Sequence, residues 1–460
     1  MVINVNDSYD IVEKSIVVNR VKIKILFSET ITDTYTIENF ILESIQHLNK
    51  KQLKKLDNNL PNTNISKIKY KDISHYLYNG FIIIITKWHV YASEAKGSLS
   101  RSIPTIDGEV SVTGPKDAFI EHFNTNIGLI RRRIPNKRLV VETMNIGRLT
   151  NTRVGILHIK GITNKKLIED IKKKLETIDI DGLCDSSYLK RSLERKRQLF
   201  PTIMLTERPD KSVMALLEGK VVIMVDNSPY ALILPSFLID FFHTVDDYYQ
   251  KSLHVSFIRI IRVFAFLIAV LTPAVYIAVT TRNYGIVPLD LLLMLKAGRT
   301  FVPFPAYLEA IFMIICFEIL KESDLRMSTT NGSAVSILGG LILGDAAVAA
   351  GIVSPIMIII IAISSIAGLT FSSIEFVNVL RFYKVSLLIL SSFLGIIGVA
   401  IGTFFLIFNL LQTKSFGYKY LTPLIPLEKN ELKDSIIKLD EDKLYRNSVI
   451  TNNRYRGNIR

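Results

Sequence analysis

Several residue patterns that would define a catalytic or metal-binding centre are missing from this chain of 460 residues. The two cysteines, Cys184 and Cys316, have no zinc-site spacing, and they lie in parts of such different polarity that we expect no disulfide. The seven histidines are scattered singly, and no phosphate loop, dinucleotide fingerprint or His-Glu-x-x-His pair occurs. No nucleophile has a recognisable neighbouring base. We therefore expect that the protein is not an enzyme and that it binds no cofactor and no metal.

The N-terminus also lacks the basic and apolar pattern of a secretory signal, from Met1 to Tyr9. A soluble region that starts in this way is expected to stay in the cytoplasm. The net charge is +14, but no nucleic-acid-binding motif accompanies it. Since cationic segments beside membrane spans are attracted to anionic headgroups, membrane lipids are the expected partner and nucleic acid is not.

Long charge-free runs dominate the second half of the chain. A helix rises about 1.5 Å per residue, so roughly 20 apolar residues cross the hydrocarbon core. Three runs reach that length: Val263–Thr281, Ala346–Ile374 and Val385–Thr413. The sequence therefore predicts an α-helical transmembrane bundle over residues 251–413.

The number of spans is four or five, because two shorter apolar blocks, Pro303–Leu320 and Met327–Gly344, lie between the long runs. Arg259 and Arg262 place the start of the first span in the cytoplasm, and the lysines that follow Thr413 favour the same side for the tail, residues 414–460. Five spans and two cytoplasmic ends disagree in parity. Either one block, with Pro303–Leu320 as the candidate, is re-entrant or interfacial, or two blocks form one hairpin.

The first 250 residues predict a soluble α/β region of two subdomains, residues 1–110 and 111–250. In the first, strands are expected at Val21–Phe27 and Phe81–Ile85, a helix at Ile37–Leu48 and a loop at Ser93–Gly108. In the second, we expect a strand at Arg153–Ile162, a helix capped by Asn164, and a hairpin of Val221–Val225 with Tyr230–Leu234.

A helix opening at Gly114-Pro115 is also predicted, with apolar residues at helical spacing up to Ile134. Arg131, Arg132 and Arg133 close it, where cations complement the helix dipole. The three arginines form either a solvated helix end or a contact with a partner or with lipid headgroups.

The aromatic and acidic segment before the first span is the candidate link between the soluble part and the membrane. It runs from Pro235 to Tyr249 and includes Asp246 and Asp247, which we take as coupling candidates. The alternative is a last helix packed on the soluble region.

Ionisable residues at membrane depth are costly, so Glu309 and Asp345 are candidates for an ion path. Alternatively, either residue sits at an interface. The pairs Gly340/Gly344 and Gly398/Gly402 have the four-residue spacing that lets helices approach closely, which is typical of a packed bundle or an oligomer.

Several segments together resemble the A subunit of the GerA-type germinant receptors of endospore-forming bacteria. In family order they are GPKDAFIEHFNTNIGLIRRR from Gly114, IDIDG from Ile178, TERPD from Thr206, LLEGKVVIMVDNSPYALILPSF from Leu216, VDDYY from Val245, VPFPAYLEA from Val302, GDAAVAAGIVSP from Gly344, SFG from Ser415 and TPLIPL from Thr422. The resemblance implies a transporter-like B subunit that holds the nutrient site, a lipoprotein C subunit, and a location in the spore inner membrane.

That resemblance also implies that nutrient binding triggers release of monovalent cations, with A-type subunits assembled as a homo-oligomeric ring whose spans line a channel. Our leading hypothesis is a receptor subunit that converts nutrient binding on a partner into ion release. The alternative is a non-conducting scaffold whose spans only anchor it. A secondary transporter would show inverted internal repeats, and none is seen. The sequence does not name the nutrient or the number of subunits.

Overall fold

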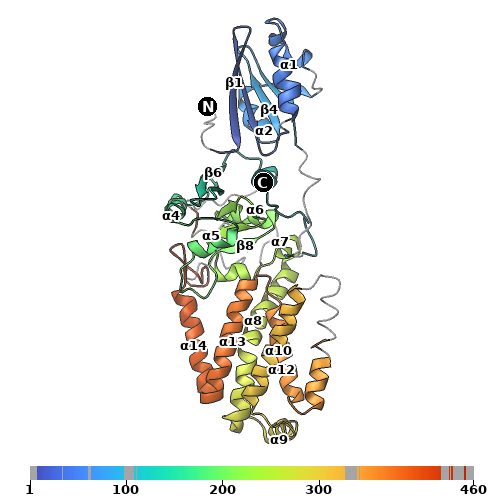
Figure 1. The fold of residues 1–460 in the computed structure, drawn as a ribbon, viewed down its shortest axis with the longest axis vertical. Helices are drawn as coiled ribbons and strands as arrows, with labels where there is room; N and C mark the ends of the chain where they lie inside the picture. The colour runs from blue at the N-terminus through green and yellow to red at the C-terminus, as the bar shows by residue number, and fades with distance from the viewer. Residues whose placement is uncertain are drawn as a thin grey trace.

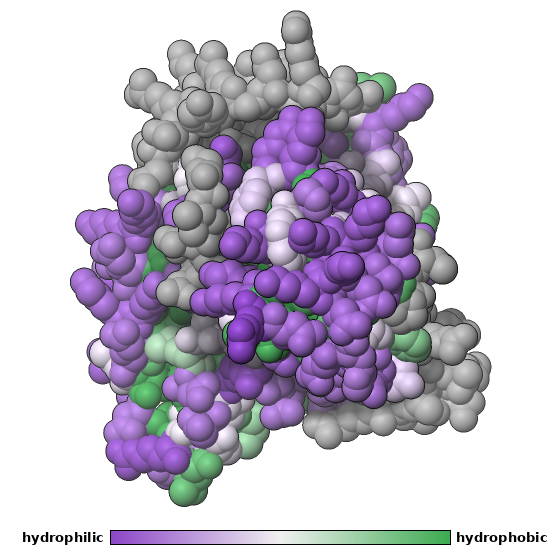
Figure 2. All heavy atoms as spheres, turned by 90° about the horizontal axis from the view of Figure 1, so that it is seen from above, coloured by the Kyte–Doolittle hydropathy of each residue, from purple (hydrophilic) through white to green (hydrophobic). Residues whose placement is uncertain are grey.

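The computed structural model describes residues 8–33, 35–60, 64–97, 108–109, 111–326, 339–340, 342–425, 435, 437–438 and 450–451. Three parts follow one another along its longest axis (Figure 1). A small sheet with its helices stands at one end, a second sheet with helices lies in the middle, and long helices fill the other end. The side chains exposed at the N-terminal end are mainly hydrophilic (Figure 2).

The first sheet is antiparallel, with strand order β1-β2-β4-β5-β3. Alternation along its strands buries Ile23 and Ile25 on one face, under a helix that carries Ile37 and Ile41. Because these apolar patterns are local, the strands and the helix lie where the sequence predicts them. The elements are β1 Ile11–Val18, β2 Val21–Ser28, a π-helical turn Thr36–Leu42 continuing as α1 Glu43–Gln46, η3 Gln52–Lys54, η4 Leu56–Asn58, β3 Ile65–Ile68, η5 Tyr70–Asp72, α2 Ile73–Leu77, β4 Phe81–Ile85 and β5 Val90–Glu94.

The second sheet is also antiparallel, in the order β6-β7-β9-β10-β8. The predicted hairpin is confirmed, with Ala231 opposite Met224. The predicted cap is confirmed too, since the Asn164 side chain accepts a hydrogen bond from Lys166 N over 3.0 Å. The elements are α3 Phe123–Arg133, β6 Leu139–Ile146, β7 Thr152–Ile159, α4 Lys165–Glu176, α5 Ser186–Leu193, β8 Met204–Thr206, α6 Pro209–Glu218, β9 Val221–Val225, β10 Ala231–Leu234, η6 Leu238–Phe241 and α7 Asp246–Tyr249.

The helix predicted to open at Gly114-Pro115 begins only at Phe123. The residues before it are held in an extended course by tertiary hydrogen bonds. Phe119 N donates to Glu207 O over 2.8 Å, and the Asn126 side chain accepts from Ile120 N over 2.8 Å. Helical periodicity alone could not reveal these partners.

The C-terminal half forms a layer of helices: α8 Ser252–Thr281, η7 Tyr284–Ile286, α9 Leu289–Ala297, α10 Ala306–Arg326, a helical stretch at 342–349, α12 Pro355–Gly368, α13 Ile374–Leu394 and α14 Ile396–Gln412. Among the described residues, two helices, α8 and α13, are long and apolar enough to cross a membrane. Length and composition thus support two of the four or five expected spans, and the others stay predictions.

Backbone breaks explain the difference. The charge-free run 346–374 is interrupted at Gly351, whose φ is +64°, and α12 then provides only 14 residues. The run 385–413 contains the end of α13 and all of α14, separated at Gly395 with φ +62°. A run without charges does not reveal such a turn. Of the block 327–344, residues 327–338 and 341 lie outside the described part, as do residues 98–107 of the predicted loop.

The chain enters the helical layer at the start of α8 and leaves it at the end of α14, and both points lie on the side of the second sheet. α8 starts beside α7, and α14 ends at Gln412, after which Ser415 Oγ donates to Thr202 O over 2.8 Å. The far end is marked by Gly395, which packs on Asn283. The described tail residues return to the second sheet through β11 Lys414–Ser415 and β12 Tyr418–Lys419. Most of the predicted tail, 414–460, lies outside the described residues.

Candidate coupling site

The segment Pro235–Tyr249, here called the coupling segment, connects the second sheet to α8. It is not one amphipathic helix, because two short helices, η6 and α7, are separated by residues 242–245. Its aromatic residues point into a cluster shared with the long helices. The Phe241 and Phe376 rings lie 5.4 Å apart, and the Phe242 and Phe371 rings 5.3 Å apart. The segment is thus packed between the soluble region and the helices.

Asp247 is the centre of a buried ion-pair cluster at this junction. It is 2% exposed and accepts hydrogen bonds from two arginines of α8. Arg259 Nε lies 3.0 Å from Asp247 Oδ2, and both terminal nitrogens of Arg262 bind the carboxylate, at 2.8 and 3.0 Å. One carboxylate thus faces two guanidinium groups, on the second and third turns of the longest helix.

Backbone oxygens accept further hydrogen bonds at this cluster. Arg262 Nη1 donates to Phe242 O over 2.8 Å, and Arg259 Nη1 donates to Ser435 O over 3.1 Å. Lys438 Nζ donates to Asp247 O over 2.9 Å. The coupling segment, α8 and the tail therefore meet at one cluster.

The electrostatics of Asp247 follow from this arrangement. Burial alone would raise the pKa of the carboxyl group, but the hydrogen bonds and charges of Arg262 and Arg259 outweigh burial and lower the pKa below its usual value. The carboxylate stays ionised because the positive charges of the two arginines stabilise it. Removing it would leave two buried guanidinium groups without their counter-charge.

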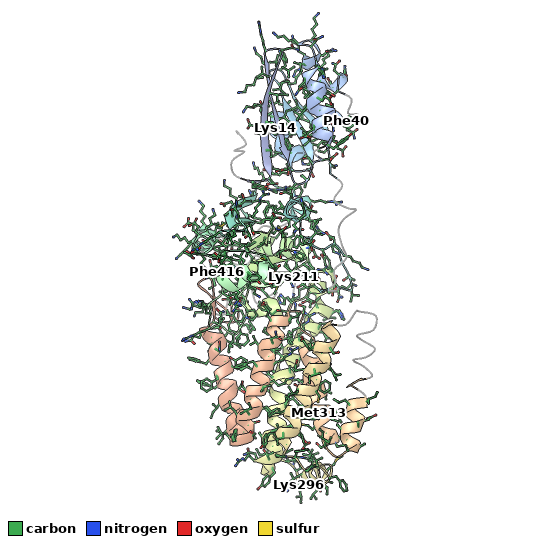
Figure 3. The ribbon with its side chains drawn as sticks, in the orientation of Figure 1. Lys14, Phe40, Lys211, Lys296, Met313 and Phe416 are labelled. Carbon is green, nitrogen blue, oxygen red and sulfur yellow. The ribbon has the colours of Figure 1, made fainter. Side chains whose placement is uncertain are left out.

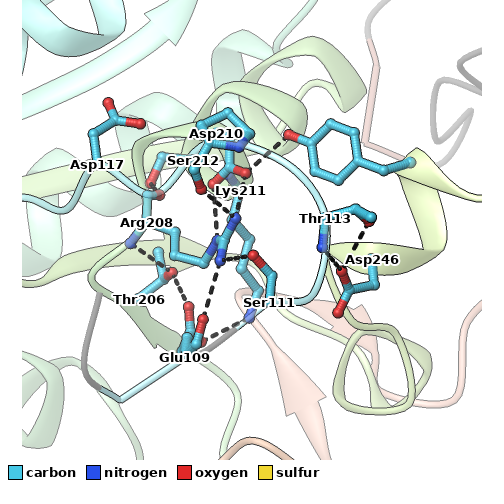
Figure 4. A network of polar contacts seen from close by, with 12 residues as sticks. Glu109, Ser111, Thr113, Asp117, Thr206, Arg208, Asp210, Lys211, Ser212 and Asp246 are labelled. Atoms are coloured by element: carbon cyan, nitrogen blue, oxygen red, sulfur yellow. Dashed lines mark hydrogen bonds and ion pairs between the residues drawn. The ribbon is translucent and has the colours of Figure 1, made fainter. Parts of the chain in front are cut away.

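A second network of polar contacts lies at the same end of the coupling segment (Figure 4). Arg208, fully buried at the start of α6, binds Asp210 at 2.7 and 3.0 Å and donates to Ser111 Oγ at 2.6 Å. Tyr249 Oη donates to Asp210 over 2.9 Å, and the Tyr249 ring covers Gly114, where a Cβ atom would come within 2.5 Å of it. The network thereby joins TERPD, Gly114-Pro115 and VDDYY.

A third contact joins the soluble region to α13. Lys190 of α5, which is 3% exposed, donates to Glu375 in the first turn of α13. Burial lowers the pKa of Lys190 to about 8. Phe200 stacks on Tyr383 of the same helix at 5.7 Å. The long helices α8 and α13 are therefore both fastened to the soluble region by buried charges.

The other coupling candidates have more local roles. Asp246 accepts hydrogen bonds from Val112 N and Thr113 N, both at 3.1 Å. Arg131 is fully buried and binds Asp10 at 2.7 and 2.8 Å, so it ties the first sheet to the second region.

The two remaining arginines of the run differ from Arg131. Arg133 pairs with Asp117 at 2.6 Å, and Arg132 is exposed. A purely solvated helix end is therefore wrong for Arg131 and Arg133, because both are engaged by carboxylates within the chain. Arg132 is the member of the run that is open to an outside contact.

The two ion-path candidates differ in their surroundings. Glu309, 1% exposed in α10, accepts from Arg299 at 2.8 Å and from the Ser354 backbone N and Oγ at 3.1 and 3.0 Å. Its charge is thus balanced, and it holds the start of α12. Asp345 lies in the stretch 342–349 and is exposed in the single chain.

The two glycine pairs also differ. A Cβ atom on Gly398 would lie 2.2 Å from Leu390 O, and one on Gly402 would lie 2.3 Å from Leu387, so this pair lets α14 approach α13 within the chain. At Gly340 the nearest atom is 4.0 Å away, from Leu320, and at Gly344 nothing lies within 4 Å.

The sequence identified several residues of the site, but it did not reveal which residues they contact within the chain. Arg259 and Arg262 served only as topology markers, and Arg208 and Lys190 were not singled out. The sequence signal that could have identified such residues is a charged residue about one turn before or after an apolar helix. Within the described part of the chain, no group of three or more His, Cys, Asp or Glu residues could hold a metal ion.

The geometry defines a class of protein: an α/β soluble region fastened by buried ion pairs to a layer of apolar helices. The family model described as Bacillus/Clostridium GerA spore germination protein matches residues 2–448, and the chain belongs to this family. The family resemblance found from the motifs is therefore confirmed. The family description names a role in germination and no reaction.

Two curated relatives match nearly the whole chain. Spore germination protein KA of Bacillus subtilis (strain 168) is 36% identical, over 95% of this chain and 82% of the relative. Spore germination protein GerQA of Bacillus cereus is 33% identical, over 98% and 91%. Another relative in Bacillus subtilis (strain 168) bears the description uncharacterized membrane protein YfkQ, with 35% identity over 75% and 67%.

Among solved structures, the crystal structure of the N-terminal domain of the A subunit of the Bacillus megaterium spore germinant receptor GerK3 is 28% identical. The match covers 51% of this chain and 91% of that one, with a TM-score of 0.40.

Proposed function

We propose that this chain is a membrane-embedded subunit of a germinant receptor, which couples nutrient recognition on a partner subunit to ion movement across the spore inner membrane. The partners are the transporter-like B subunit and the lipoprotein C subunit, and the soluble region faces the cytoplasmic side. Family membership and the names of the relatives support the germination role.

The observation that carries the coupling is the Asp247 cluster. If a partner displaced the soluble region while α8 stayed in place, Asp247 would be separated from Arg259 and Arg262. Separating buried partners costs about 3–5 kcal/mol. It is therefore cheaper for α8 to follow the soluble region, and movement is transmitted to the helical layer.

Apolar surface supports membrane insertion and self-assembly. Phe264 of α8 is 60% exposed, Phe393 of α13 is 69% exposed and Phe404 of α14 is 64% exposed in the single chain. Large exposed apolar surfaces mark contact with lipid or with other subunits. We infer that lipid and neighbouring copies cover these faces, and that copies together form the conducting ring.

Asp345 is the better candidate for an ion path. Its side chain is exposed in the single chain and stands next to small residues in Gly344 and Ala346, so it can face water in an assembly. Glu309, by contrast, is already satisfied by Arg299 and Ser354. That Glu309 already has its partners within the chain favours the second candidate function, a non-conducting scaffold whose membrane acids only hold helices together.

Cation flux from liposomes that contain the purified full chain and its B partner tests the proposal. We expect nutrient-dependent flux that changes in Asp345→Asn and is unchanged in the control Asp181→Asn, which alters an exposed acid of the soluble region. Glu309→Gln is a poor probe, because it would leave Arg299 without its partner. Liposomes that stay tight with folded, oligomeric wild-type protein and nutrient would rule out the channel and support the scaffold.

A further inference from the structure

The helical layer contains a pocket of about 430 Å³ between α8, α10, α12 and α13. Its volume falls in the range of small-molecule sites. Apolar residues such as Phe317 and Leu380 line it together with four charged ones. Leu369, another lining residue, is 61% exposed, so the pocket reaches the outer surface of the helices.

The pocket carries an excess of positive charge. Lys321, Arg381 and Lys384 are its cations and Glu318 is its acid. Glu318 is occupied, since Arg381 Nη1 lies 3.0 Å from Glu318 Oε2. Lys321 and Lys384 therefore make no direct ion pair with a residue that lines the pocket, within the described part of the chain.

Lys384 is the unusual member of this set. It is only 5% exposed, and within the described part of the chain its ammonium group has no hydrogen-bond or ion-pair partner. A buried ammonium group without a partner is costly, so an anion or water must meet it in the pocket. Lys384 follows Glu375, the residue tied to the soluble region, by nine positions, which is about 14 Å along α13.

We propose that this pocket binds the anionic headgroup of a membrane phospholipid. The phosphate would bind Lys384 and Lys321, and the acyl chains would lie along apolar walls such as Phe317 and Leu380. The inference rests on the proposed membrane location. A free phosphate ion would satisfy the same lysines, but it would make no use of the apolar walls.

Such a lipid would act on the helices that the soluble region controls. The pocket lies between α10 and α13, where Glu318 of α10 pairs with Arg381 of α13. A bound anion would strengthen this contact, because it would bridge Lys321 of α10 and Lys384 of α13. Anionic lipid would then be a regulator of how easily α13 moves.

Native mass spectrometry of the full chain in neutral detergent provides the test. The protein is titrated with phosphatidylglycerol, with zwitterionic phosphatidylcholine, and with inorganic phosphate. We expect preferential binding of phosphatidylglycerol, weakened at least about tenfold by Lys384→Met, which keeps the side-chain length and removes the charge. Lys384→Arg should restore the preference.

The matched control is Lys296→Met. Lys296 is an exposed lysine of α9, at the far end of the helices (Figure 3), and its loss should leave binding unchanged. Lys384→Met should fold, because it removes an unpaired buried charge. Lys321→Met provides a second variant in case it does not, with a weaker but measurable loss of binding expected.

Three outcomes would overturn the proposal. Equal binding of both lipids by wild type and Lys384→Met would refute a headgroup site. Phosphate binding that depends on Lys384 without any lipid preference would identify a free anion. If Lys384→Met changed the oligomeric state and left lipid binding unchanged, Lys384 would instead form an ion pair with a carboxylate of a second copy of the chain. Cation flux by a wild type without lipid preference would leave the proposed function standing.

Discussion

Replacing Asp247 by asparagine should open the junction between the soluble region and α8. The substitution keeps the shape of the side chain but removes the negative charge that faces Arg259 and Arg262. Because both arginines are at most 7% exposed, breaking this buried cluster should cost about 3–5 kcal/mol. The loss corresponds to an increase of about two to three and a half orders of magnitude in local opening.

Hydrogen exchange of the full chain, followed by mass spectrometry over residues 244–256, measures this opening. Asp246→Asn is the matched control, since Asp246 is more exposed and mainly caps the backbone at Val112 and Thr113. Its replacement should change exchange by less than about tenfold. Adding Arg262→Met to Asp247→Asn should restore part of the protection, because one uncompensated cation is removed.

Equal exchange in Asp247→Asn and Asp246→Asn would refute this reasoning. It would mean that the junction is held by its aromatic packing and that the ion pairs contribute little. No recovery in the double variant would show that the buried charge itself is not the cause of the opening.

Three further predictions address the rest of the chain. Burial lowers the pKa of His158 to about 4, so only the unfolded chain takes up a proton between about pH 6.5 and pH 4. Stability should therefore fall by about 3 kcal/mol as pH drops through that window, and urea titrations of His158→Gln should show a shallower pH dependence than wild type. Gly398→Ala should cost about 1–3 kcal/mol by overpacking α14 against α13, whereas Gly344→Ala should be neutral or stabilising, as thermal midpoints in detergent would show. Arg131→Met should cost about 3–5 kcal/mol and raise exchange in β1, because Asp10 stays buried without its counter-charge; the exposed Arg132→Met should have no effect there, and equal effects of the two would contradict the assigned contact.

Local patterns determined a large part of this protein from the sequence. Short apolar segments located β2, β4 and the β9–β10 hairpin, and Asn164 located the start of α4, because both signals act within a few residues. The ordered motifs identified the family, and the charge-free runs located the apolar helices.

Only the tertiary structure decided how these parts are joined. Lys190 meets Glu375 across 185 positions, and Glu309 meets Ser354 across 45. Asp247 is an interfacial acid by sequence, but it is the counter-charge of two arginines by structure. Helix propensity and hydropathy are local, whereas an ion pair depends on which helices pack together. For the same reason, a long apolar run could not disclose that it turns back at Gly395.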